Sequence, residues 1–548
     1  MDYKKLAELV FPHVTKTVEY YENEAYPKRN LPEGAKVTRL GPSPTGFIHL
    51  GNLYGAFVDE RLAHQSGGVF MLRIEDTDEK RKVEGAVETI ISSLEYFGLK
   101  FDEGAGIEGE TGNYGPYFQS SRAEVYQCFA KHLVEMGRAY PCFCSSEELE
   151  ELRNNQAEEN VNTGYYGKWA RDRNLSLEEV QAHLYNNEEF VIRFRSEGAE
   201  EGIFEIDDAI RGRLSVRENY QDAVILKTNG IPTYHFAHVV DDHLMRVTHV
   251  VRGEEWLSTL PIHYEIFKTF GWEIPVYCHT AHLMKMDNGA KRKLSKRKDP
   301  ELGLDYYREL GYHPAAVREY LLTILNSNFE EWRMENPDSP IDDFKFSLEK
   351  MSNSGALFDL DKLNNISKDV LLKIPAEEIY EFLQNWANKY KTEAAELLSS
   401  DKDEVIKLLS VGRDGQKPRK DLMYCEQILD FISYYFDEYF KIIDNYPENI
   451  NEEEVKSLLN AYLRTYEHSD DQAQWFEKIR TIASESGYAA KPKDYKKNPE
   501  MYKGHVGDVS TVIRIALVGR ASSPDVWELQ QIMGEEKVRG RIENAINS

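Results

Sequence analysis

Between residues 36 and 97 the sequence alternates strand-like and helical segments, and this order constrains the fold more than any other feature. Residues 36–40 and 69–74 are short apolar runs typical of strands, and residues 50–67 and 83–97 have apolar positions at helical spacing. Strand, helix, strand, helix is the pattern of a parallel sheet whose strands are joined by helical crossovers. We therefore predict an α/β domain that begins near residue 36.

This α/β order is interrupted and then resumes. Residues 121–136 are amphipathic and helical, residues 139–144, 190–195 and 222–228 resemble strands, and residues 151–185 are polar and read as helical. Residues 247–252 and 263–270 then resemble a further strand and helix of the first domain, and after residue 303 the strand signals fade. The predicted segments are 1–35, an N-terminal extension; 36–118 and 226–330, two halves of one domain; 119–225, an inserted α+β domain; and 331–375 and 376–548, both helical.

Charge and composition exclude several classes of protein. The chain of 548 residues has a formal net charge of −27, so only a local basic face would suit it to nucleic acid. One such island lies between Lys285 and Pro300, where seven Lys or Arg residues stand against two Asp. No apolar run approaches the roughly 20 residues of a membrane span, and the charged N-terminus lacks a signal-peptide core. Five cysteines are too few for a disulfide framework, so we expect a cytoplasmic protein.

A rigid corner, GPSPTGFIHLGN at residues 41–52, follows the first predicted strand. The loop would lie at a strand's carboxyl end and a helix N-terminus, where exposed N–H groups and the helix dipole favour an anion. Gly51 would let a ligand approach the backbone, and His49 can donate a hydrogen bond to a phosphate oxygen. Taken alone, the segment is better explained as a structural turn with a capping histidine.

The basic island contains KLSKRK at residues 293–298, after a glycine-containing loop. Lysines on a mobile loop can meet phosphate charge that builds up in a transition state. The island could also be a solvated charge run or a non-specific RNA patch.

Five motifs in order carry a resemblance to a known family. PSPTGFIHLG (42–51), LRIEDTD (72–78), PTYHFAHVVDDHLM (232–245), VVRGEEW (250–256) and KLSKRK (293–298) resemble the glutamyl-tRNA synthetases of the bacterial type, which are class I aminoacyl-tRNA synthetases. HLGN is similar to the first class-defining motif, with Asn52 in place of its second histidine, and KLSKR is similar to the second. The likeness covers residues 36–330 and implies a Rossmann-type catalytic domain with an insertion, followed by all-α domains.

The resemblance implies a two-step reaction. Glutamate and ATP give glutamyl-adenylate and pyrophosphate, and the glutamyl group then passes to the 3′-terminal adenosine of tRNA(Glu). No protein nucleophile is needed, so catalysis consists of positioning and charge neutralisation. The family positions at ATP are His49, Gly51, Asn52, Glu255, Lys293 and Lys296, of which His49, Lys293 and Lys296 would be catalytic. We expect Mg²⁺ to accompany ATP.

The resemblance also implies a pocket for glutamate. Its residues would be Arg39, Ser43, Glu75, Tyr234, His238 and Arg252. Glu75 suits the ammonium group, whereas Arg39 and Arg252 can each grip a carboxylate with two hydrogen bonds. His238 departs from the family pattern, which has an asparagine there, and this leaves substrate discrimination at that position open.

Some family members carry a zinc knuckle in the inserted domain, and Cys142-Phe143-Cys144 resembles half of one. The second half should lie near residues 165–175, where the sequence has neither Cys nor His. Two ligands do not make a tetrahedral site, so we predict buried thiols and no zinc.

For tRNA, the resemblance assigns the acceptor end to residues 119–225, stem contacts to 331–375 and the anticodon to 376–548, in a chain that we expect to be a monomer. Three alternatives stay open: an enzyme that also glutamylates tRNA(Gln), a glutaminyl-tRNA synthetase, and a tRNA-binding paralogue without catalysis.

Overall fold

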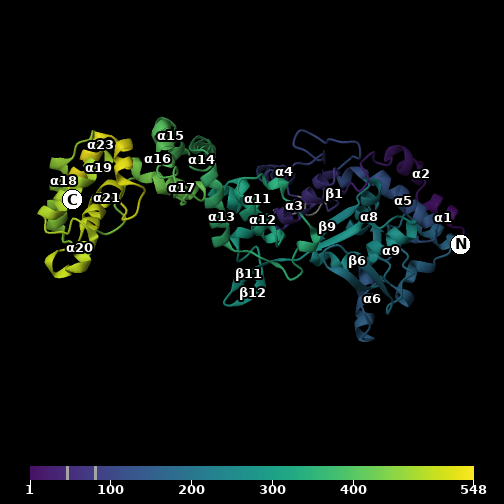
Figure 1. The fold of residues 1–548 in the computed structure, drawn as a ribbon. Coiled ribbons are helices and arrows are strands. Elements are labelled where there is room, and N and C mark those ends of the chain that lie inside the picture. The colour runs from purple at the N-terminus through teal and green to yellow at the C-terminus, as the bar shows by residue number, and fades with distance from the viewer. Residues whose placement is uncertain (45–47, 79–82) are drawn as a thin grey trace. The chain divides into compact units, whose positions relative to one another are not determined.

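The structure, a computed structural model, describes residues 1–44, 48–78 and 83–548 (Figure 1). It divides into two compact units, which are described separately. Unit 1 consists of Met1–Tyr306 and Arg318–Asp359, and unit 2 consists of Tyr307–Val317 and Leu360–Ser548.

A three-stranded parallel sheet opens unit 1, as the alternation predicted. β1 (Val37–Leu40) pairs in parallel with β2 (Val69–Leu72), which pairs in parallel with β3 (Glu103–Gly104). The crossovers are α3 (Leu50–Gln65) and α4 (Ala86–Tyr96). The second half of the domain adds β9 (His249–Gly253) and β10 (Val276–Thr280), also parallel, with α9 (Leu260–Phe270) between them. Thr248 N–H donates to the carbonyl of Val37 at 2.9 Å, so the entry to β9 lies beside β1.

The inserted region contains the predicted strands as one antiparallel sheet. β4 (Ala139–Cys142), β5 (Val191–Phe194) and β8 (Val224–Leu226) form it. Its helices are α5 (Ala123–Glu135), α6 (Ser146–Glu158) and α7 (Leu177–Tyr185), and Ser145 and Glu148 form a capping box at the start of α6. The prediction of one helical stretch over 151–185 is wrong, because between α6 and α7 the chain makes only two short 3₁₀ turns.

A hairpin within residues 119–225 extends the sheet formed by β9 and β10. β6 (Ile203–Asp208) and β7 (Gly212–Arg217) pair with each other, and β6 also bridges β10, which gives the order β7-β6-β10-β9. The sequence did not indicate these strands, since most of their residues are exposed or half-buried and carry no clear apolar face.

The N-terminal extension is part of the core of unit 1. α1 (Tyr3–Val10) places Leu6 and Val10 in the same hydrophobic core as α5 and α8 (Tyr234–Leu244), and Val18 and Tyr20 of the short α2 (Val18–Tyr20) pack against this core. Glu22 accepts hydrogen bonds from the indole of Trp272 at 2.8 Å and from His243 at 2.9 Å. The extension therefore packs on α8, the helix that carries Tyr234 and His238.

The rest of unit 1 is a hairpin and a mixed segment. β11 (Leu283–Asp287) and β12 (Ala290–Lys293) are joined by an Asn288-Gly289 turn in which both residues have positive φ, and β13 (Ala356–Leu357) pairs with β11. Two helices after the hairpin, α10 (Leu304–Leu310) and α11 (Pro314–Leu325), are divided between the units, because residues Tyr307–Val317 belong to unit 2, and α12 (Phe329–Glu335) lies in unit 1. Residues 336–359, which were predicted to be helical, contain no α-helix, because Pro337, Pro340 and Gly355 interrupt them.

Unit 2 is helical, as predicted. Its helices surround one core that includes Trp386, Ile479 and Ile513. They are α13 (Leu360–Lys373), α14 (Ala376–Tyr390), α15 (Thr392–Ser400), α16 (Lys402–Ser410), α17 (Cys425–Ile432), α18 (Glu452–Thr465), α19 (Gln472–Glu485), α20 (Pro492–Lys497), α21 (Val506–Val518), α22 (Val526–Met533) and α23 (Glu535–Asn547).

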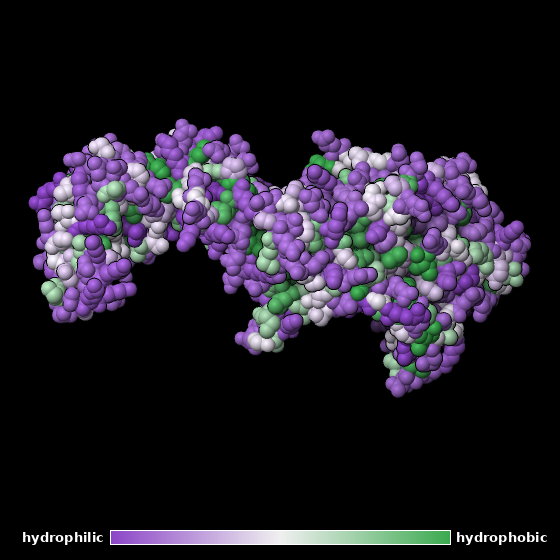
Figure 2. All heavy atoms as spheres, viewed as in Figure 1, coloured by the Kyte–Doolittle hydropathy of each residue, from purple (hydrophilic) through white to green (hydrophobic). Residues whose placement is uncertain are grey.

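Hydrophobic side chains are mostly inside. On the face seen in Figure 2, small hydrophobic areas are scattered among mostly hydrophilic residues. In the part of the chain that the structure describes, no helix has the length and apolarity that crossing a membrane requires.

If the extension is part of the core, removing one of its buried side chains should destabilise unit 1. Leu6 is 2% exposed, so Leu6→Ala should lower the free energy of unfolding by about 2–5 kcal/mol in denaturant titrations followed by the fluorescence of Trp272. Lys4→Ala, on the exposed side of the same helix, is the control. An equal stability of the two variants would contradict the packing described here.

Candidate active site

Four predicted glutamate-binding residues come from separate elements and meet in one buried group. Arg39 is on β1, Glu75 follows β2, Arg252 is on β9, and Tyr234 begins α8. The pKa of Tyr234 is raised to about 12, chiefly by burial and also by the charge of Glu75, while the guanidiniums of Arg252 and Arg39 oppose this rise. All three charged groups thus lie within electrostatic reach of one phenol.

Asp242, on α8, holds two arginines at this site. Nε of Arg39 lies 3.1 Å and Nη1 of Arg73 lies 2.7 Å from Oδ1 of Asp242, and Nη2 of Arg73 also donates to Glu75 at 3.0 Å. Burial opposes ionisation of Asp242, but the two guanidiniums outweigh it and keep its pKa below the usual range. The charge of Arg39 is therefore already compensated inside the protein.

His238 lies one turn along α8 from Tyr234 and is fully buried. Its Nδ1 lies 3.3 Å from Nη2 of Arg39, which can only donate, and 3.4 Å from Oδ2 of Asp242. Burial, and then the charge of Arg39, hold the pKa of His238 well below its usual range, so the ring is neutral. With Nδ1 accepting from Arg39, the proton sits on Nε2, which has no partner among the described residues.

Arg252 is surrounded differently from Arg39. It is 8% exposed; its Nε donates to Nε2 of His279 at 2.9 Å and its Nη1 lies 3.2 Å from Nδ1 of His263. Among the described residues no carboxylate lies within ion-pair distance of Arg252, and its Nη2 is buried without a partner. A buried cation without a counter-ion, and with one free donor, suits a carboxylate ligand.

Gly41 is a site residue that the sequence analysis missed. A Cβ there would stand 2.4 Å from Oε1 and 2.8 Å from Cδ of Glu75, so any other residue would displace this carboxylate from its present position. Its position directly before the PSPTG corner was the available signal. Ser43 is exposed, and Thr45, Gly46 and Phe47 of the corner lie outside the described residues.

His49 caps the N-terminus of α3, as expected if the corner at residues 41–52 is a structural turn with a capping histidine. Its Nδ1 accepts from the N–H of Asn52 at 3.3 Å, while Oδ1 of Asn52 accepts from the N–H of His49 at 3.1 Å. Since Nδ1 accepts, the neutral ring carries its proton on Nε2 and can donate to a phosphate oxygen. A Cβ on Gly51 would stand 3.0 Å from the imidazole, so glycine lets the ring lie over the start of the helix.

The basic island divides into structural and free cations. Arg292 donates to both oxygens of Asp299 at 2.6 and 2.8 Å, Ser295 N–H donates to the same carboxylate, and Lys285 pairs with Glu301. Lys296 is exposed and forms no ion pair among the described residues. The structure thus fixes the base of the loop and leaves Lys296 available.

His49 and Lys296, far apart in sequence, are brought within electrostatic reach of each other. Burial lowers the pKa of His49, and the charges of Lys296 and Lys293 lower it further, against the opposing charge of Glu255. His282 lies between Glu255 and Lys293. Its Nδ1 is 3.4 Å from Oε2 of Glu255, and its Nε2 is 3.2 Å from Nζ of Lys293. The predicted ATP residues therefore form a second group.

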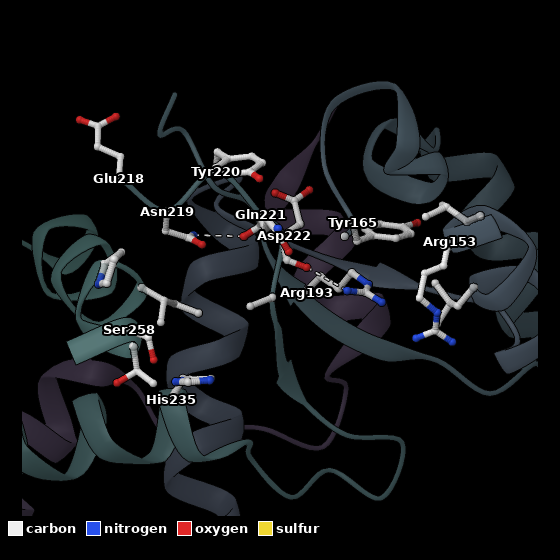
Figure 3. A pocket seen from close by; sticks show the side chains of 17 residues that line it. Arg153, Tyr165, Arg193, Glu218, Asn219, Tyr220, Gln221, Asp222, His235 and Ser258 are labelled. Atoms are coloured by element: carbon white, nitrogen blue, oxygen red, sulfur yellow. Dashed lines mark hydrogen bonds between the residues drawn. The ribbon is translucent and has the colours of Figure 1, made fainter. Parts of the chain in front are cut away.

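A polar cleft of about 540 Å³ lies beside the first group (Figure 3). His235 and Ser258 line one side, and Asn219, Gln221 and Arg193 of the inserted region line the other. His235 Nδ1 lies 3.1 Å from Nε2 of His263, a partner of Arg252. The cleft is thus connected through His235 and His263 to Arg252, one of the predicted glutamate-binding residues.

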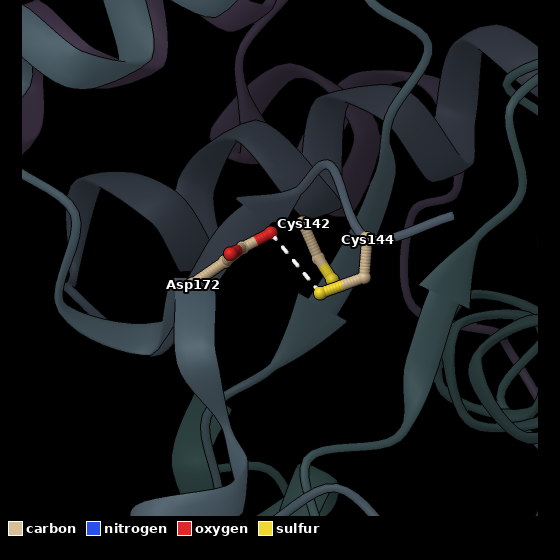
Figure 4. Close-up of side chains that lie close together, drawn as sticks. All are labelled: Cys142, Cys144 and Asp172. Atoms are coloured by element: carbon tan, nitrogen blue, oxygen red, sulfur yellow. Dashed lines mark hydrogen bonds between the residues drawn. The ribbon is translucent and has the colours of Figure 1, made fainter. Parts of the chain in front are cut away.

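Cys142 and Cys144 meet a third potential ligand, Asp172 (Figure 4). The sequence analysis passed over this residue because it sought only Cys or His between residues 165 and 175. Asp172 is already engaged, since its Oδ2 accepts from Phe143 N–H at 2.7 Å and its Oδ1 from Arg171 at 2.9 Å. Among the described residues no other Cys, His or carboxylate joins the cluster, so these residues do not fit a tetrahedral structural zinc site.

Comparisons with known proteins agree with this geometry. Residues 36–365 match the class I tRNA synthetases (E and Q), catalytic domain, and residues 500–546 match an anticodon binding domain. Over its whole length the chain is 78% identical to the full glutamate–tRNA ligase of Acetivibrio thermocellus. It is 51% identical to that of Clostridium perfringens strain 13, over 99% of this chain and 100% of the relative.

Solved structures show the same relationship. A glutamate tRNA ligase from Elizabethkingia meningosepticum, in complex with its amino acid, superposes with a TM-score of 0.71 at 26% identity, covering 94% of this chain and 99% of that one. The glutamate-tRNA synthetase of Elizabethkingia anophelis gives a TM-score of 0.70 at 27% identity, covering 94% and 100%. The expected fold class, a class I catalytic domain followed by helical domains, is confirmed, and the chain belongs to the glutamate–tRNA ligase family of class I aminoacyl-tRNA synthetases.

Proposed function

We propose that this chain attaches glutamate to the 3′ end of tRNA(Glu) through a glutamyl-adenylate, and that Arg252 selects the amino acid by its side-chain carboxylate. The observation that supports this assignment most is the uncompensated charge of Arg252, since Arg39 already has Asp242 as its counter-ion. The names of the relatives do not favour a glutaminyl enzyme or a paralogue without catalysis.

In the pocket, Glu75 would bind the ammonium group of glutamate. Burial raises the pKa of Glu75, but the charges of Arg73 and Arg39 oppose this rise and favour the ionised form. Tyr234 and the Nε2–H of His238 add neutral donors for carboxylate oxygens. An imidazole can thus serve at the position where the family pattern has an asparagine.

In the first step, the α-carboxylate of glutamate attacks the α-phosphorus of ATP and pyrophosphate leaves. The Nε2–H of His49 would hold a phosphate oxygen, with Gly51 and Asn52 fixing the ring. Lys293 and Lys296 would neutralise the charge that develops on the leaving pyrophosphate, and Glu255 would contact the nucleoside side. Mg²⁺ would arrive bound to the phosphates, because the described residues near His49 form no cluster of metal ligands.

For tRNA we propose two contact regions, one in each unit. In unit 1 the cleft in Figure 3 offers amides and arginines to the acceptor end. In unit 2 a pocket of about 700 Å³ is lined by Arg419, Arg514 and Phe476, which could stack on an anticodon base, whereas Trp475 is buried in the helical core. The stem-contact role of residues 331–375, a cytoplasmic location and a monomeric state stay predictions from the sequence.

Lys296→Ala should lower kcat for adenylate formation roughly a hundredfold or more, with a smaller change in the KM for ATP, because the lysine meets charge that develops mainly in the transition state. Lys291→Ala, at an exposed lysine on the preceding strand β12, is the control. An unchanged kcat would remove Lys296 from the mechanism.

Replacing Arg252 with alanine should collapse the use of glutamate and spare any residual use of glutamine. Glutamate and glutamine are nearly equal in size, so the pocket must sort them by charge, and losing a desolvated charge pair costs roughly 2–5 kcal/mol. The measurement is kcat/KM for both amino acids, with Arg213→Ala on the exposed face of β7 as control. If the glutamate-to-glutamine ratio does not change, Arg39 or His238 becomes the next residue to test.

Purified protein should contain well under one zinc per chain by elemental analysis. Cys142→Ser should leave folding nearly intact, as should Cys128→Ser at a buried cysteine outside the cluster. Stoichiometric zinc that is lost in Cys142→Ser but kept in Cys128→Ser would show that Cys142 is a zinc ligand and would contradict this prediction.

A further inference from the structure

Three neighbouring strands place an aspartate, a histidine and an arginine side by side. In the order β6-β10-β9, Asp208 ends β6, His279 is on β10, and Arg252 is the register partner of His279 on β9. Nδ1 of His279 lies 2.6 Å from Oδ2 of Asp208, and its Nε2 accepts from Nε of Arg252 at 2.9 Å. All three side chains are at least nine-tenths buried.

The row has one consistent proton arrangement. Nε of Arg252 can only donate, so Nε2 of His279 accepts and Nδ1 carries the proton to Asp208. Asp208 is held in turn by the backbone N–H groups of Ile210 at 3.0 Å and Arg211 at 2.9 Å. The carboxylate therefore orients the imidazole, and the imidazole orients the guanidinium.

The same row keeps the negative charge at a distance from Arg252. His279 stands between Asp208 and the guanidinium, and the other hydrogen-bond partner of this guanidinium, His263, is also an imidazole. Burial lowers the pKa of both rings, so both are neutral. Arg39 and Arg73, by contrast, contact the carboxylate of Asp242 directly.

We propose that His279 is a specificity-determining positioning residue, which with Asp208 orients Arg252 through a neutral contact and so reserves the charge of that arginine for an anionic amino-acid side chain. This proposal rests on the assignment of Arg252 as the carboxylate-binding residue. A carboxylate in place of His279 would satisfy the guanidinium internally and compete with the substrate.

The experiment compares His279→Glu with His279→Gln in the full-length protein. Both variants offer Arg252 an oxygen acceptor, but only the first offers a charge. In tRNA(Glu) charging assays, the KM for glutamate should be at least about tenfold higher for His279→Glu than for His279→Gln. The glutamate-to-glutamine ratio of kcat/KM should also be lower for His279→Glu. The KM for ATP should change less than about twofold in either variant. The matched control is His64→Glu. His64 also contacts an aspartate, with its Nε2 3.1 Å from Oδ2 of Asp102, but both of these side chains are partly exposed to solvent.

Asp208→Asn keeps the test decisive if His279→Glu does not fold. It removes the charge that orients His279, so the KM for glutamate should rise while the KM for ATP stays constant. Equal glutamate KM values for His279→Glu and His279→Gln would overturn the proposal, as would a parallel loss of ATP binding. If Arg252→Ala leaves the amino-acid preference unchanged, the assignment of Arg252 itself fails; if only the His279 and Asp208 variants are silent, the failure concerns this proposal alone.

Discussion

Two consecutive aspartates on α8, Asp241 and Asp242, are the anchor on which the rest of the proposed glutamate pocket depends. Asp242 pairs with Arg39 of β1 and with Arg73, while Oδ1 of Asp241 accepts from Arg122 at 2.8 Å. These groups are almost completely buried, and removing one partner from such a pair costs roughly 3–5 kcal/mol. The cluster holds α8 against the ends of two strands and thereby fixes Tyr234 and His238 over the pocket.

The anchor continues into the N-terminal extension. Arg122 also donates to the hydroxyl of Tyr26 at 2.9 Å, and Arg246, just after α8, donates to the carbonyls of Glu22 and Tyr26 at 2.6 and 2.5 Å. The N-terminal extension, for which the sequence alone indicates no role, is thus packed and hydrogen-bonded around the helix that carries Tyr234 and His238.

The cations near the candidate site fall into two groups, those that contact a carboxylate of the protein and those that do not. Arg39, Arg73 and Arg292 each contact a carboxylate of the protein, so they build structure. Arg252 has imidazole partners, Lys293 contacts His282, and Lys296 is exposed. Because a cation without an internal counter-ion gains most from an anionic ligand, the second group is the one suited to a carboxylate and to phosphates.

The sequence by itself determined the features that depend on local patterns. Hydrophobic periodicity located β1, α3, β2 and α4, the capping box of Ser145 and Glu148 was visible in four residues, and five ordered motifs identified the family. Only the tertiary structure decided what depends on contacts between distant segments. It placed the largely exposed β6–β7 hairpin in the catalytic sheet, brought Asp172 to the two cysteines, and set His279 between Asp208 and Arg252. Spacing along the chain carries no information about such pairs, because their strands come together only when the sheet forms.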